Sequence, residues 1–333
     1  MMTAATTDDR SSTGRDPLDY ATGYHAPVLS HEVVRLLVTN PSGTYVDGTL
    51  GGGGHTEALL DRLAAAGRVI GIDRDADALH EVRARLSEDI ATERLQLIRG
   101  SFGELGQLLD VLGTEKVDGL LLDLGVSSHQ IDEPERGFSF QQEAPLDMRM
   151  DDRSGLTADE VVNSWSEDDL RDVLRSFGEV RGAGRIARTI VATRPIATTT
   201  ELADAVRSVV PTRDEVKILA QVFQAIRIAV NRELEQIERV LQEAVERLLE
   251  GGRMAVISYH SLEDRRVKRF FRHGNLEGEP QRDVFGNALT PWHELTRKPV
   301  RASEEEVEAN PRARSARLRV AERIVIPDNP PAP

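Results

Sequence analysis

The stretch YVDGTLGGGGH, residues 45–55, joins a short apolar run and an acid to four consecutive glycines, and a helical pattern follows it. Glycine has no Cβ, so it allows positive φ and lets backbone N–H groups approach a ligand closely. The helix that follows would point the positive end of its dipole at the same place. The pattern therefore predicts a loop that holds a nucleotide-like cofactor.

Strand-like apolar runs alternate with helical patterns after this loop. Helices are expected over residues 57–66, 76–86 and 104–112, and strands over residues 68–73, 94–99 and 117–123. Such alternation is typical of a parallel α/β sheet. Ligands bind at the carboxyl ends of the strands in these sheets, and the glycine loop lies at such an end.

The alternation stops near residue 130, and only helical signals follow up to residue 227. The sheet is expected to resume after a helix over residues 233–250 that ends at Gly251-Gly252. A strand over 254–258, a basic helix around 267–271 and a last edge strand over 314–320 follow. The expected division is a disordered tail over 1–22, a cofactor-binding domain over 23–130 and 228–326, an inserted helical subdomain over 131–227, and a Pro-rich tail over 327–333.

Composition excludes several kinds of protein. The 42 basic and 56 acidic side chains give a formal charge of −14, which argues against a uniformly basic nucleic-acid binder. The absence of cysteine excludes disulfides, thiolate metal sites and a cysteine nucleophile. The eight histidines include no pair at i and i+4, so no metal site is expected. With no apolar run of about 18 residues, the chain is interpreted as a cytoplasmic protein that does not enter a membrane.

The acid in front of the glycines indicates which cofactor the loop holds. Asp47-x-Thr49-x-Gly51-x-Gly53 is similar to the D/E-x-G-x-G-x-G loop of S-adenosylmethionine-dependent methyltransferases, with Thr49 in place of the first glycine. A carboxylate suits a cofactor that carries an ammonium and a sulfonium. Asp73, at the end of the next strand, is placed to accept hydrogen bonds from ribose hydroxyls.

Each of these features has a simpler explanation when it is taken alone. A Gly-rich turn can be only a tight connection, an acid after a strand can cap a helix as Asp75 could, and Asp123 could be a solvated loop acid. The joint occurrence of Asp47, Asp73 and Asp123 at successive strand ends favours a nucleoside-cofactor site.

Longer motifs in the chain resemble one family. They are DGTLGGGGH at 47–55, LLDLGVSS at 121–128, ERGFSF at 135–140, PLDMRM at 145–150, FQAIRIAVN at 223–231, SYHSLEDR at 258–265 and NPRARS at 310–315. The chain resembles the bacterial ribosomal RNA small subunit methyltransferase H family, also called MraW, from about residue 25 to residue 323. The resemblance implies a Rossmann-like class I methyltransferase sheet with helices on both faces and an inserted all-helical subdomain.

The resemblance also implies an activity, which is methyl transfer from S-adenosylmethionine to the N4 amine of a cytidine in the decoding region (P site) of 16S ribosomal RNA. By matching position, the cofactor contacts would be Gly53, Gly54, His55, Asp73, Phe102, Asp123 and Gln130. Phe102 suits an apolar wall for adenine, although it could also be an ordinary core aromatic. The chain departs from the family at residues 218–222, which read ILAQV where many members read His-Pro-Ala-x-Arg.

The sequence gives weaker signals for the residues that bind the target base and act on it. Methylation at ring carbon 5 of cytosine uses a cysteine, which this chain lacks, so an amine or hydroxyl is the expected acceptor. Asp123, or the carbonyls after it, could accept hydrogen bonds from the N4 amine and serve as the catalytic group. His260 with Ser261 and Glu263 forms a second candidate, although the same residues could be a helix capping box.

The resemblance also implies that the partner is 16S ribosomal RNA in the small ribosomal subunit. Arginines near Arg265 and near Arg312 and Arg314 would supply two local positive patches for phosphate, although charge runs are also found on solvated faces. Met148 and Met150 could form a wall for a flipped base, or belong to a core. Two other functions remain open, which are an NAD-dependent dehydrogenase and an RNA-binding assembly factor without catalysis. The oligomeric state is also left open, and a homodimer is one possibility.

Overall fold

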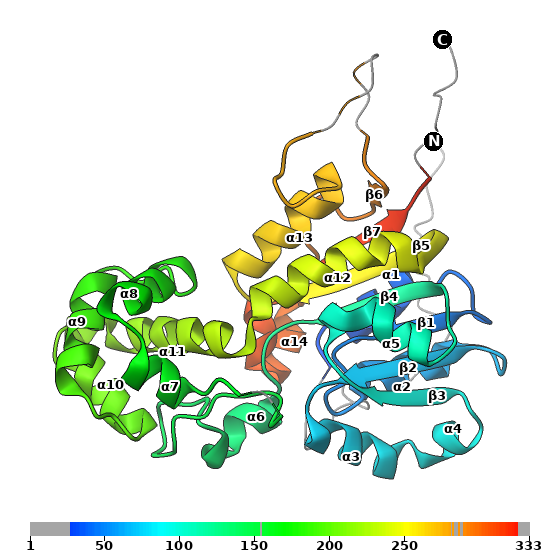
Figure 1. Cartoon of the computed structure of the whole chain (residues 1–333). Coiled ribbons are helices and arrows are strands. Elements are labelled where there is room, and N and C mark those ends of the chain that lie inside the picture. The colour runs from blue at the N-terminus through cyan, green and yellow to red at the C-terminus, as the bar shows by residue number, and fades with distance from the viewer. Residues whose placement is uncertain (1–26, 154, 281, 283–285, 287–288, 326–333) are drawn as a thin grey trace, which may run out of the picture.

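The computed structural model of the chain describes residues 27–325 except 154, 281, 283–285, 287 and 288. The tails expected at 1–22 and 327–333 therefore lie outside the described residues. Figure 1 shows a sheet flanked by helices and, beside it, a separate group of helices. None of the helices in the described part is long and apolar enough to cross a membrane.

Within the described residues, seven strands form one mixed sheet in the order β3-β2-β1-β4-β5-β7-β6. The strands are β1 Thr44–Asp47, β2 Arg68–Asp73, β3 Leu95–Arg99, β4 Val117–Asp123, β5 Leu248–Ser258, β6 Trp292–Glu294 and β7 Arg317–Arg323. Strands β1 to β5 are parallel, and β7 runs antiparallel between β5 and β6. This order confirms the expected Rossmann-like class I methyltransferase sheet.

Helices cover both faces of the sheet because both faces are apolar. One face packs on α5, α12 and α13, and the other on α1, α2 and α3. The bounds are α1 Ser30–Leu37, α2 Gly54–Arg62, α3 Ala76–Arg85, α4 Ser87–Ala91, α5 Leu105–Val111, α6 Ser128–Asp132, α12 Glu233–Arg247, α13 Ser261–His273 and α14 Glu304–Ala309, with short 3₁₀ turns at Phe102–Glu104, Pro134–Arg136, Thr212–Asp214 and Pro311–Ser315.

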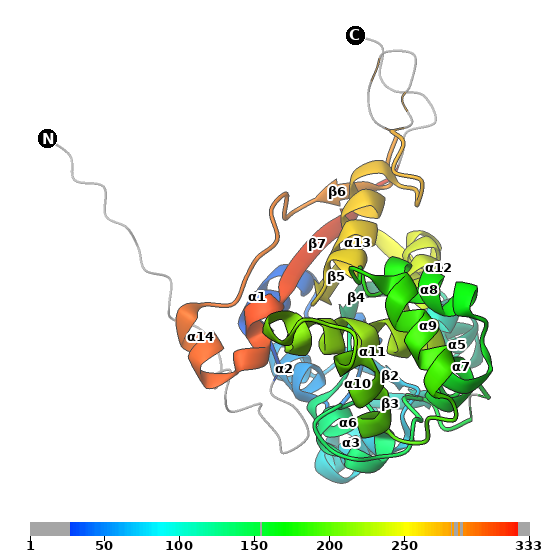
Figure 2. The ribbon, with the colours of Figure 1, turned by 90° about the vertical axis from the view of Figure 1, so that its left-hand side faces the viewer.

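The remaining helices form a bundle around a core of their own. They are α7 Ala158–Ser164, α8 Glu167–Ser176, α9 Ala183–Thr193, α10 Thr199–Arg207 and α11 Glu215–Asn231. Figure 2, viewed from the bundle's side, places these helices in front of the sheet. Asn231 connects the end of α11 to the loop that precedes α7. Its side chain donates to the Met148 carbonyl at 2.7 Å and accepts from the Met150 N–H at 2.8 Å.

The sequence-based prediction is wrong where helix and strand patterns overlap. The helix expected over 233–250 ends at Arg247, and Leu248 already pairs with Val117 in the sheet. Gly251 and Gly252 lie inside β5, at a shift in its register with β4, and do not end a helix. Leu248 fits the helical spacing of the residues before it, so periodicity alone could not separate the two elements.

The last strand was also expected in the wrong place. Strand β7 covers Arg317–Arg323 and lies inside the sheet, and the edge strand is the three-residue β6. A strand of three residues is too short to leave a period-2 pattern in the sequence. Its Trp292 is buried against Phe270 and Phe271, with ring centroids 6.3 and 5.4 Å apart.

Candidate active site

The glycine loop is organised by a buried acid. Asp47, at the end of β1, has no solvent exposure, and its carboxylate accepts hydrogen bonds from the Thr49 N–H at 3.2 Å and the Thr56 hydroxyl at 2.8 Å. Gly51 and Gly53 have φ values of 48° and 76°, which side chains disfavour. The expectation that Asp47 faces a cationic cofactor is therefore wrong, because its oxygens point into the loop.

Asp73 holds the loop from the neighbouring strand β2. Its Oδ2 accepts the Gly51 N–H at 2.8 Å, and its Oδ1 accepts the Asp75 N–H at 2.9 Å. Burial raises the pKa of Asp73 to about 6, although these two N–H groups oppose the shift. Asp75 caps α3, as the alternative explanation from the sequence proposed.

A cavity of about 390 Å³ opens beside this loop, at the carboxyl ends of the strands. Its walls include most residues expected to contact the cofactor or the substrate: Gly54, His55, Asp73, Phe102, Asp123, Gln130, His260 and Arg312. Gly53, Ser261, Arg265 and Arg314 are not part of the wall. A Cβ on Gly53 would come within 2.8 Å of Val82, so this glycine serves packing against α3.

Asp123, at the end of β4, lies at the centre of a buried polar group. The Tyr259 hydroxyl donates to its Oδ1 at 2.9 Å, and His55 Nε2 lies 3.4 Å from its Oδ2. Burial and the adjacent carboxylate raise the pKa of Tyr259 well above its usual value, so this hydroxyl stays protonated and donates. The backbone N–H of Asp123 donates to the Thr49 hydroxyl at 2.6 Å, which joins β4 to the glycine loop.

Gln130 and Phe102 line the same end of the cavity. Gln130 is fixed at the start of α6, since its side chain accepts from the Ser127 N–H at 3.1 Å and donates to Asp75 Oδ2 at 2.9 Å. Phe102 is 7% exposed, and the Arg74 guanidinium lies 5.8 Å from its ring centroid. Phe102 is thus both part of the core and part of the cavity wall.

The opposite wall contains residues that the sequence analysis missed. Arg227 on α11 and Glu233 on α12 form a buried ion pair with N–O distances of 2.8 and 2.9 Å. Arg232 separates the two helices and adopts a left-handed conformation, with φ 51°. Gln224 lies one turn before Arg227 on α11 and also faces the cavity. Polar residues within the apolar FQAIRIAVN motif were the signal that could have found this wall.

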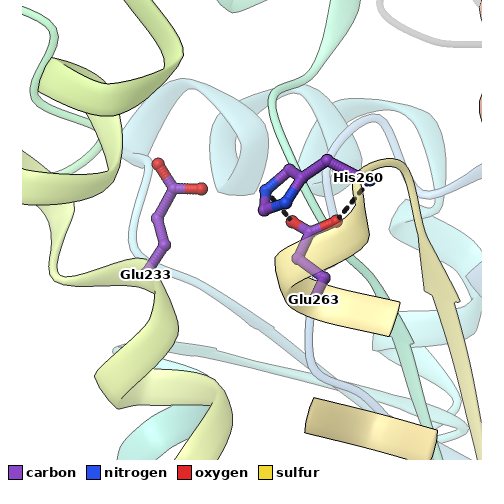
Figure 3. A group of neighbouring side chains, drawn as sticks. All are labelled: Glu233, His260 and Glu263. Carbon is purple, nitrogen blue, oxygen red and sulfur yellow. Dashed lines mark hydrogen bonds and ion pairs between the residues drawn. The ribbon is translucent and has the colours of Figure 1, made fainter. Parts of the chain in front are cut away.

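Three potential metal ligands converge at this wall. Glu233, His260 and Glu263 each offer one ligand atom, and these atoms lie within 4.8 Å of one another. Figure 3 shows Glu233 coming from one side and the His260–Glu263 pair from the other. Distant stretches of sequence supply this group, so a search for closely spaced histidines could not find it.

The two basic patches are smaller than expected. Arg317 and Arg319 both pair with Asp264, and Arg319 is 5% exposed, so neither presents a free charge for phosphate. Arg265 pairs with Glu179, whose carboxylate also accepts from Ser261. Other arginines near these segments are paired as well: Arg266 with Glu238, Arg272 with Glu294 and Arg312 with Asp132. Within the described residues, Lys268, Arg269 and Arg314 are exposed without an ion pair.

Comparison with known proteins decides the family. The sequence model described as the MraW methylase family matches residues 22–324. The chain belongs to the MraW methylase family. Ribosomal RNA small subunit methyltransferase H of Flavobacterium johnsoniae is 47% identical over 304 residues, covering 90% of this chain and 98% of that protein. The protein of the same name from Caldicellulosiruptor bescii is 46% identical over 307 residues, covering 90% and 99%.

Among solved structures, a putative rRNA-methylase from Clostridium thermocellum is weakly similar to this member of the MraW methylase family. Its TM-score is 0.41 at 16% identity, with 94% of this chain and all of that chain covered. The departure from the family pattern at 218–222 lies in the bundle, where Ile218, Leu219 and Val222 are buried in its core. In this MraW methylase the segment therefore contributes packing, and it does not line the cavity.

Proposed function

We propose that this protein transfers a methyl group from S-adenosylmethionine to the N4 amine of a cytidine in the decoding region of 16S ribosomal RNA. Membership of a methylase family supports the reaction class. The name shared by the relatives, ribosomal RNA small subunit methyltransferase H, supports the RNA substrate. The observation that carries the proposal is a single cavity. The glycine loop and the acids at the strand ends line one side of it, and polar residues also line the opposite wall.

The residues present fit S-adenosylmethionine. Asp73 would accept ribose hydroxyls, Phe102 would lie against the adenine, and Gly54, His55 and Gln130 would complete that end of the site. Asp123 would face the cationic part of the cofactor, since its carboxylate is 8% exposed and lines the cavity. The cavity volume is within the usual range for small-molecule sites. When bound, the sulfonium supplies an electrophilic methyl group.

The RNA would approach from the mouth of the cavity. Arg312 lines the cavity and Arg314 lies two residues further along the chain, exposed to solvent. Arg265 and Ser261 lie at the start of α13, outside the cavity wall, and would contact RNA only around the target nucleotide. Phosphate contacts of this kind orient the RNA without reading its sequence.

The function is tested by mass spectrometry of 16S RNA from a deletion strain, before and after the gene is restored. We expect N4-methylcytidine to be absent from the deletion strain and to return with the wild-type gene. An unchanged N4-methylcytidine signal would refute the proposal. Titration calorimetry with S-adenosylhomocysteine and with NAD separates a methyltransferase from a dehydrogenase, since only the former should show binding to S-adenosylhomocysteine.

Cofactor affinity is expected to fall on acidification because of Asp73. Its pKa of about 6 means that the carboxylate, which accepts ribose hydroxyls, predominates above pH 6 and is lost as the pH falls below it. Between pH 7 and pH 5 the ionised fraction falls about tenfold, so the dissociation constant for S-adenosylhomocysteine should rise about tenfold. Calorimetry at both pH values checks this. The Asp73→Asn variant should bind S-adenosylhomocysteine more weakly at pH 7, and its affinity should not change with pH in this way. If the affinity of the variant fell as steeply with pH, Asp73 would not be the group responsible.

A further inference from the structure

The cavity has a second polar end that the proposed cofactor contacts leave unused. Gln224 and Arg227 come from α11, Glu233 from the start of α12, and His260 and Glu263 from the start of α13. Figure 3 shows Glu233 facing the imidazole of His260, with Glu263 beside the ring. Because the target base must share the cavity with the cofactor, this end is where the acceptor amine would lie. The inference below rests on the proposed function.

Methylation of an amine releases a proton, and two other carboxylates of the cavity, Asp123 and Glu233, already accept hydrogen bonds. Asp123 accepts from the Tyr259 hydroxyl and lies 3.4 Å from His55. Glu233 accepts two hydrogen bonds from Arg227. A carboxylate oxygen that already accepts a hydrogen bond has fewer lone pairs free to receive the proton of the amine.

His260 differs from these carboxylates, because neither of its ring nitrogens, like those of His55, has a hydrogen-bond partner among the described residues. Its Nε2 lies 3.1 Å from Oε1 of Glu263. Its Nδ1 has no hydrogen-bond partner in the described part of the chain, and the side chain is only 13% exposed. A carboxylate beside Nε2 favours the tautomer with its proton on Nε2, which leaves a lone pair on Nδ1.

The surroundings of Glu263 favour that tautomer of His260. Its side chain is 1% exposed, and its Oε2 accepts the backbone N–H groups of Tyr259 at 2.8 Å and His260 at 3.2 Å. Burial raises the pKa of Glu263, but His260, the Tyr259 N–H and Arg227 outweigh it and lower the pKa. Glu263 therefore stays ionised, and an ionised carboxylate both orients a histidine and stabilises the imidazolium that forms when the histidine takes up a proton.

A divalent cation is the competing occupant of this group. The ligand atoms of Glu233, His260 and Glu263 are close enough for one. However, both oxygens of Glu233 accept hydrogen bonds from Arg227, and the half-buried guanidinium of Arg74 is also attracted by the Glu233 charge. A cation placed here would be repelled by two guanidinium groups with little water to screen them. The charges therefore favour a proton acceptor over a metal site.

We propose that this end of the cavity binds the target cytosine with its N4 amine toward His260, and that His260, positioned by Glu263, accepts the proton released by methyl transfer. The bond between N4 and the methyl carbon forms while the bond between sulfur and that carbon breaks. The electron pair of the broken bond stays on sulfur as a thioether. One N4 proton passes to Nδ1 of His260, and the imidazolium then releases it to solvent.

The test is the single-turnover rate of methyl transfer to 16S RNA between pH 5 and pH 9, at saturating S-adenosylmethionine. The wild-type rate should rise with pH to a plateau. His260→Asn should lower the plateau by about 10²- to 10³-fold and remove the rise. Glu263→Gln should lower the plateau by about tenfold, because the imidazolium that forms on proton transfer loses its counter-ion.

Controls separate catalysis from folding. His273→Asn, at the far end of α13, should behave as wild type. All variants should bind S-adenosylhomocysteine within about threefold of wild type, since none of the altered residues is a proposed cofactor contact. Treatment with a chelator should leave the wild-type rate unchanged.

Three results would overturn the inference. The first is a His260→Asn rate within about threefold of wild type, with the same pH profile. The second is a Glu263→Gln profile identical to wild type. The third is loss of activity on chelation and its return with one equivalent of Zn²⁺ or Mg²⁺, which would make His260 a metal ligand. If the wild-type protein does not methylate 16S RNA, the proposed function is refuted as well. If the wild-type protein is active and the variants behave as it does, only this inference is refuted.

Discussion

Replacing Asp123 with alanine is expected to lower kcat/KM for methyl transfer by about 10³-fold or more, roughly 4 kcal/mol. The substitution removes the carboxylate proposed to face the cationic cofactor, leaves the Tyr259 hydroxyl without its acceptor in a buried site, and takes away the charge 3.4 Å from His55. The affinity for S-adenosylhomocysteine should fall in parallel. Steady-state kinetics with labelled cofactor, together with calorimetry, measures both effects.

Two milder variants form a graded series with Asp123→Ala. Asp123→Asn keeps an acceptor for Tyr259 but lacks the charge, and we expect a loss of about 10²-fold. Tyr259→Phe keeps the charge but frees the carboxylate to move, and we expect about a tenfold loss. A rate for Asp123→Ala within threefold of wild type would contradict the role given to Asp123. A large loss of kcat with unchanged cofactor affinity would instead indicate that Asp123 acts on the target amine.

Replacing Asp47 with alanine is expected to destabilise the folded protein by about 2 to 5 kcal/mol and to abolish measurable binding of S-adenosylhomocysteine. The Thr49 N–H and the Thr56 hydroxyl would lose their acceptor in a site without solvent exposure. The glycine loop would then lose the contact that fixes its conformation. Urea denaturation gives the free energy of unfolding, and calorimetry gives the affinity.

Asp47→Asn is the matched control for this effect. Burial raises the pKa of Asp47, so the surroundings do not favour its charge, and its shape should matter more. The amide keeps an acceptor for the Thr49 N–H, and the Thr56 hydroxyl can accept from the new NH₂ group. We expect a loss of about 1 kcal/mol at most. If asparagine were as damaging as alanine, the charge of Asp47 would be the essential property.

The sequence predicted the first half of the sheet well, because each strand there is a short apolar run between clear turn signals. Strands β2 and β4 have the predicted bounds. The C-terminal half was harder, because residue 248 continues the helical spacing and β6 is too short to leave a pattern. Which elements pair in that half depends on contacts between distant segments, and local periodicity carries no information about them.

The residues of the site were also predicted well where the signal was local, and poorly where it depended on distant segments. Motifs within single loops pointed to residues that the structure places on the cavity wall, such as His55, Asp73 and Asp123. Asp47 looked like a cofactor contact because its position in the loop was known but the direction of its side chain was not. The Arg227–Glu233 pair was missed because it forms across a helix break, and the partners of the surface arginines could not be read from charge runs.

Strand β7 has a consequence for the order in which the protein can be completed during synthesis. It lies between β5 and β6 and is the last of the described strands to be made, after all five parallel strands. Until residues 317–323 emerge, β5 keeps an unpaired edge and β6 has no neighbour. Tyr259 and His260 directly follow β5, so the nascent chain could assemble its glycine loop early, but the wall that contains these two residues would be fully supported only after residues 317–323 have been made.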